Sequence, residues 1–208
     1  MKLGRNVGWL VLPAVALALL VLPAARAGHD EDALKLMQEH KLTLAKAVET
    51  AEAASKGVAI GVQVKLDGKK GQVIVHCFVK DECMAVPVDI KTGKAEKASK
   101  ATAAEEKDTH IGQPKDIAKA VGDAKTTLVK AIEAAEKSHG KAVSVATKLE
   151  GAKLDFAVRV VDGGKATTVT VDAKGNVVKG DENKKPEPKK PEPKPEPKPT
   201  PKPEPKKP

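Results

Sequence analysis

The chain is almost without aromatic side chains. Its 208 residues include two Phe, one Trp and no Tyr. Single-strand nucleic-acid binders stack bases on aromatic side chains, so this composition argues against that class. There are only two cysteines, Cys77 and Cys83. Two cysteines cannot form a disulfide-dense scaffold or a four-cysteine zinc site, which excludes both of those classes.

Catalytic and metal-binding motifs are also missing. No serine lies in a Gly-x-Ser-x-Gly turn, and neither a Gly-rich phosphate loop nor a His-Glu-x-x-His pair is present. His76, Cys77 and Cys83 would be the nearest set of metal ligands. Successive strand residues point to opposite faces, so His76 and Cys77 do not converge. We expect a protein that is not an enzyme, with no catalytic residue, cofactor or metal.

Residues 1–27 have the pattern of a signal peptide. A basic start precedes a long apolar stretch, and Ala-Arg-Ala at 25–27 places small residues where signal peptidase cleaves. The alternative is a retained membrane anchor, which needs about 20 apolar residues. Pro13 and Pro23 interrupt the stretch and favour cleavage before Gly28. We therefore expect an exported protein, periplasmic or extracellular, with no membrane span after cleavage.

The last 28 residues, 181–208, form a proline-rich segment. They hold 11 of the 15 prolines, and lysine or glutamate stands between most of them. Proline lacks an amide donor, so this disordered tail is expected to extend as polyproline II. The signal peptide and the tail carry most of the net charge of +9. The charge is therefore not concentrated on one folded face, and no nucleic-acid partner is expected.

The segment between signal peptide and tail repeats itself. Residues 43–52 match 127–136 at an offset of 84, and after one deletion 65–68 match 148–151 at an offset of 83. Such self-similarity indicates two copies of one unit. We expect the first domain at residues 28–97, a linker at 98–114 and the second domain at 115–180.

Each copy is expected to start with helix and continue as strands. Apolar residues recur with helical spacing at Leu44, Ala47, Val48 and Ala51, and again at Leu128, Ala131, Ile132 and Ala135. A shorter apolar pattern before each predicts a lead-in helix, and Gly57 and Gly140 are expected to end the main helices. Alternating apolar residues follow, with two-residue hairpins at Lys80-Asp81 and Gly163-Gly164. The expected fold class is α+β: two tandem small units, each with helices packed on one face of an antiparallel three- to four-stranded sheet.

At this point each copy resembles the PepSY domain. The resemblance rests on the helix with Ala47, Ala51 and Glu52 and on the closing segments 88–94 and 171–177. It implies an exported, stand-alone tandem PepSY protein, from a non-catalytic family found in peptidase propeptides and secreted proteins and proposed to restrain or bind peptidases. The family-motif turn residues are Asp89, Gly93, Asp172 and Gly175. Turn chemistry alone also explains them, because Asp accepts backbone amides ahead of a glycine at positive φ.

The two cysteines allow two interpretations. Export to an oxidising compartment favours a disulfide between Cys77 and Cys83. A two-residue loop at Lys80-Asp81 instead sets Cys77 opposite Met84, and Cys83 then points to the other face. A disulfide would require a bulge to bring the two residues together.

The predicted function is an exported, non-catalytic protein-binding module. An exposed strand edge can pair with an extended peptide through main-chain hydrogen bonds, and a peptidase is the candidate partner. The alternative is an envelope-associated structural protein. In that case the lysines of the tail would bind an anionic envelope polymer or a membrane surface.

Overall fold

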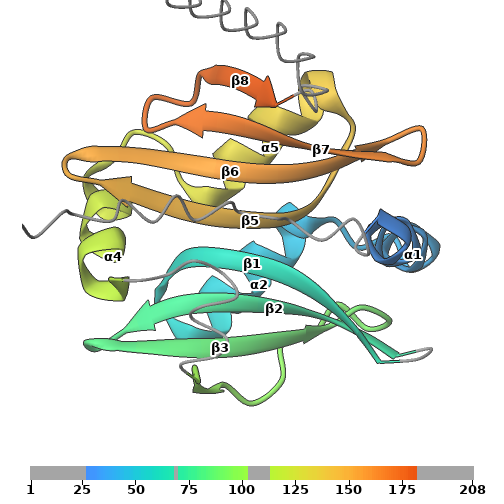
Figure 1. Ribbon diagram of the computed structural model, residues 1–208. Helices are drawn as coiled ribbons and strands as arrows, with labels where there is room; N and C mark the ends of the chain where they lie inside the picture. Colours follow the sequence, from blue (N-terminus) through green and yellow to red (C-terminus); the bar gives the residue numbers. More distant parts are fainter. Residues whose placement is uncertain (1–26, 68–69, 103–112, 182–208) are drawn as a thin grey trace, which may run out of the picture.

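The computed structural model describes residues 27–67, 70–102 and 113–181 (Figure 1). The predicted signal peptide and tail, apart from their residues nearest the folded part, lie outside the described residues, as does most of the linker.

The two sequence copies fold with the same order of elements. The first copy contains α1 (Ala27–Glu39), α2 (Leu44–Ser55), β1 (Val58–Asp67), β2 (Lys70–Val79) and β3 (Glu82–Asp89). The second contains α4 (Pro114–Asp123), α5 (Leu128–His139), β5 (Lys141–Glu150), β6 (Lys153–Asp162) and β7 (Lys165–Asp172). Each copy is followed by a short strand, β4 (Ser99–Lys100) or β8 (Val177–Asp181).

The two main helices begin as their sequences predict. Thr43 and Thr127 are the N-caps, and each hydroxyl accepts a hydrogen bond from the amide three residues on. Gly140 is the C-cap of α5, as expected. The C-cap of α2 is Lys56, in the left-handed conformation, one residue before the predicted Gly57. Gly57 does not end the helix, but only glycine fits at this position, because a Cβ there would lie 2.5 Å from the side chain of Val79.

The expectation of two separate small sheets is wrong. All strands of the described residues belong to one eight-stranded antiparallel sheet in the order β4-β3-β2-β1-β5-β6-β7-β8. The copies join at a seam, defined by the pairs Gly61–Ala146, Val62–Val145 and Gln63–Ser144. The first strand of an isolated unit would leave a row of unpaired backbone groups at an edge, and the seam pairs the middle part of that row.

The seam has an internal two-fold relation. At the repeat offset of 83, the counterpart of Val62 is Val145, and these two residues face each other. The counterpart of Gly61 is Ser144, which pairs with Gln63. The copies therefore meet as the two subunits of a symmetric dimer do, with the same surface on both sides.

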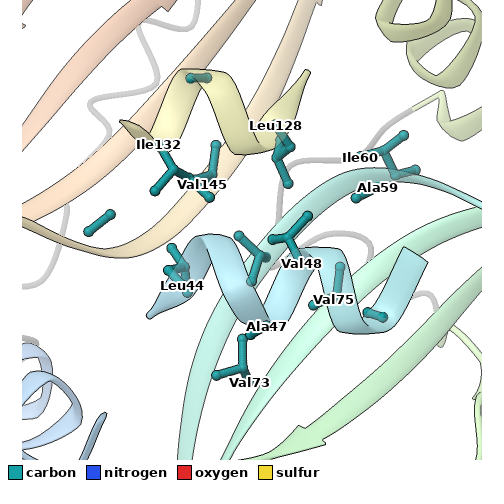
Figure 2. Close-up of a cluster of buried hydrophobic side chains, with 14 of the residues drawn as sticks. Leu44, Ala47, Val48, Ala59, Ile60, Val73, Val75, Leu128, Ile132 and Val145 are labelled. Carbon is teal, nitrogen blue, oxygen red and sulfur yellow. The ribbon is translucent and has the colours of Figure 1, made fainter. Parts of the chain in front are cut away.

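The core lies under α2 and α5, which pack side by side on one face of the sheet (Figures 1 and 2). Val48 of α2 and Ile132 of α5 belong to one continuous cluster of buried side chains, together with Val145 of β5. Phe156 of β6 is the largest fully buried side chain in that cluster. Because the cluster spans both copies, the described part of the chain has one core.

The lead-in helices cross the seam. β1 and β5 pair over only three residues each, and α1 and α4 lie against both strands at opposite ends of that pairing (Figure 1). α1 also contacts β6 and β7 of the second copy, and α4 contacts β2 and β3 of the first. An ion pair supports each of these packing contacts: Asp30 of α1 with Arg159 of β6, and Lys115 of α4 with Asp81 of the β2–β3 turn. The lead-in helix of each copy thus packs against strands of the other copy.

Candidate functional site

The first predicted turn holds Asp89 in a dense set of hydrogen bonds. Its Oδ1 accepts from the Thr92 amide at 2.7 Å and from the Thr92 hydroxyl at 2.8 Å. The Thr92 hydroxyl, and next its amide, hold the pKa of the Asp89 carboxyl below its usual value. Gly93 follows with φ of 65°. The carboxylate is therefore engaged in closing the turn.

The second turn does the same with different partners. Asp172 Oδ1 accepts from the amides of Lys174 at 2.8 Å and Asn176 at 2.9 Å, and Gly175 has φ of 88°. The Asn176 amide is the main cause that lowers the pKa of this carboxyl. Asp89 ends β3 and Asp172 ends β7, with β2, β1, β5 and β6 between them. The structure therefore does not bring the four turn residues into one site.

Cys77 and Cys83 are both buried, and no disulfide joins them in the structure. Cys77 pairs with Met84 and Cys83 with Phe78, so the two side chains point to opposite faces of the sheet. The hairpin closes in two residues at Lys80-Asp81, without the bulge that a disulfide would require. Burial raises the pKa of the Cys77 thiol to about 11, which keeps it protonated and unreactive.

A structural role for the motif glutamates was missed in the sequence. Glu52 Oε1 accepts the Ala59 amide at 2.9 Å, and Glu136 Oε1 accepts the Ala142 amide at 2.9 Å. Both amides lie where a β-bulge interrupts the pairing of the first strand with the second. The glutamate of each helix therefore stabilises the entry into the sheet. Its presence in both copies, directly after the buried alanine, was the available signal.

One outer edge of the sheet is formed by β8. This strand pairs with β7 from Val177 to Asp181, with an irregularity near Val178. Val177 is 38% exposed and Val178 is 57% exposed. The opposite outer edge is the two-residue strand β4. β8 is thus the longer of the two edge strands and carries exposed apolar side chains.

A second candidate site is the seam groove, a cavity of about 290 Å³ between α1, β1, β5 and β6. Its polar lining residues are His29, Asp30, Gln63, Lys65, Ser144 and Arg159. Arg159 Nε donates to Asp30 Oδ2 at 2.6 Å, and the two side chains are 27% and 16% exposed. Asp30 comes from the first copy and Arg159 from the second. The groove therefore exists only because the copies share one sheet.

Arg159 was not singled out by the sequence patterns. It is the only arginine after residue 26, and every other fixed cation in that part of the chain is a lysine. Arginine and lysine are not interchangeable, since only the guanidinium offers a planar fork of N–H donors. Its isolation among lysines was the signal that could have identified it. Its repeat counterpart is His76, which is fully buried.

Two classes of site are absent from residues 27–67, 70–102 and 113–181. No group of three or more His, Cys, Asp or Glu side chains there could hold a metal ion. No helix within these ranges has the length and apolar character needed to cross a membrane.

Comparison with known proteins finds little similarity to this chain. No protein-family model matches the chain, and no curated protein matches it. A structure from Clostridium difficile 630, described as a "putative lipoprotein", is similar over 64% of this chain and 88% of that chain, with 17% identity and a TM-score of 0.39. A likeness of that degree assigns neither family nor function. The PepSY resemblance therefore remains a prediction from the sequence motifs.

Proposed function

We propose that the protein is an exported, non-catalytic binding module that takes up an extended segment of a partner protein as an additional strand beside β8. The observation that carries the proposal is the pair of exposed valines on the outer edge strand, of which Val178 is 57% exposed. A peptidase is the candidate partner, because the motifs resemble the PepSY domain. Export rests on the signal-peptide pattern of residues 1–27.

Strand addition requires an edge that is long enough and accessible. β8 has five residues, and among the described residues it pairs only with β7. An incoming extended segment would gain main-chain hydrogen bonds along this edge, and its side chains would contact Val177 or Val178.

The test compares three forms of the chain from Gly28 to Pro208. Val178→Lys adds a charge to the β8 edge at a side chain that contributes little to the core. Val58→Lys is the matched control, because Val58 is 37% exposed and lies at the start of β1, away from both outer edges. Each form is used to capture proteins from the exported fraction of the source cells, at roughly 50 and 300 mM salt. Captured proteins are identified by mass spectrometry.

The proposal predicts one partner that is retained by the wild type and by Val58→Lys at both salt concentrations. Val178→Lys should lose that partner. Inhibition of a captured peptidase by the wild type would support the regulatory form of the proposal. Capture that Val178→Lys leaves unchanged would contradict binding at β8. Material that is retained by all three forms and released at the higher salt would favour the tail as the binding element.

A further inference from the structure

We propose that the seam groove binds a carboxylate group through the guanidinium of Arg159. This site is independent of the β8 edge, since it lies at the joint of the two copies and is lined by α1, β1, β5 and Arg159 of β6. Its ligand is a small organic acid or the carboxyl terminus of a peptide, and both present the same group to Arg159.

The ion pair with Asp30 orients Arg159 without using all of its donors. Asp30 Oδ2 accepts from Nε, and the side chain of Arg159 makes no other hydrogen bond to the described residues. A guanidinium has five N–H donors, so those on its two terminal nitrogens remain for a ligand. Arg159 is 27% exposed, so the group is held in place and still accessible. A fixed, planar fork of donors suits a carboxylate, which it can bind through two parallel hydrogen bonds.

The other lining residues favour an anion of small size. Lys65 adds a second positive charge, and Gln63 and Ser144 add neutral donors. Asp30 is the only carboxylate of the lining, and it already accepts from Nε. A volume of about 290 Å³ is at the lower end of the range for ligand pockets. The groove therefore suits a carboxylate with a short extension.

The repeat provides an internal comparison, because the other end of the seam lacks this arrangement. At the offsets of the repeat, Pro114 replaces Asp30 and the buried His76 replaces Arg159. Lys148 of β5 is the counterpart of Lys65 and is exposed, but it does not line the groove. We therefore expect one site per chain, with Lys148 as the matched control position.

The test observes Arg159 directly in the chain from Gly28 to Pro208. Labelling with ¹⁵N-arginine gives a single Nε–H signal, because this chain contains one arginine. The probes are N-acetyl-dialanine, its C-terminal amide and succinate, each titrated at constant ionic strength against sodium chloride. We expect saturable movement of the signal with a dissociation constant on the order of 1–10 mM, the scale of two charge-assisted hydrogen bonds.

Two outcomes support the site and distinguish its ligand. Movement with the peptide acid but not with its amide assigns the carboxyl terminus of a peptide, whereas stronger binding of succinate assigns a free acid. Lys65→Gln should weaken binding about two- to fivefold, and Lys148→Gln should leave it unchanged. No saturable movement with either carboxylate overturns the proposal. Equal losses in the two lysine variants also overturn it. So does tighter binding of inorganic phosphate, titrated in the same way, than of either carboxylate.

Discussion

Replacing Phe156 by alanine tests whether the two copies share one core. Phe156 is the largest fully buried side chain and lies on β6 of the second copy. Removing a buried phenyl ring costs about 3–5 kcal/mol of unfolding free energy. In a domain of this size each kcal/mol lowers Tm by about 2–4 °C, so Tm should fall by about 6–20 °C.

The test of the shared core is whether the loss of stability reaches the first copy. The buried cluster continues from Phe156 through α5 to Val48 and Val75 of the first copy. A change in the second copy should therefore lower the stability of the whole molecule. Calorimetry should show one transition before and after the substitution. Hydrogen exchange should show weaker protection of the β2 amides in the variant. Two transitions of which only one moves, or unchanged protection of β2, would refute the single core.

Three further predictions concern individual side chains. Glu136→Ala leaves a strand amide without its partner and should cost about 1–3 kcal/mol in guanidinium unfolding, and an unchanged midpoint would contradict the bulge role. The pKa values of Asp89 and Asp172 are lowered in the folded protein, so these carboxylates contribute stability above their usual pKa of about 3.9. That stability is lost as the pH falls through the folded pKa values. Replacing both residues by asparagine should therefore make Tm depend less steeply on pH at the acid end of a series of thermal unfolding measurements. Cys77 and Cys83 should resist a thiol reagent in the folded protein and react fully after unfolding without reductant, whereas no reaction would reveal a disulfide.

Local structure could be predicted from the sequence because it depends on neighbouring residues. The buried faces of α2 and α5 follow the helical spacing, and the hairpins form at Lys80-Asp81 and Gly163-Gly164 as expected, with positive φ at all four residues. The seam could not be predicted in this way. It contains three residue pairs with ordinary strand composition, and alternation of side chains does not specify which strand edges meet.

In the candidate sites, too, local contacts could be predicted from the sequence and long-range contacts could not. The turn role of Asp89 was open to prediction because its partners lie within a few residues. The contact between Asp30 and Arg159 joins residues 129 positions apart and depends on the copies forming one sheet. A sequence pattern that predicts two separate units cannot place a carboxylate of α1 in the first copy beside β6 of the second. The isolated arginine was the remaining indication.

The central claim is that the two copies form one sheet at the seam. Nuclear Overhauser contacts between backbone protons of β1 and β5 test it most directly, in the chain from Gly28 to Pro208. A single sheet should give cross-strand contacts for Gly61–Ala146, Val62–Val145 and Gln63–Ser144, as strong as those between β1 and β2. Contacts confined to β1–β2 and β5–β6, with none across the seam, would contradict the single sheet and remove the basis of the groove.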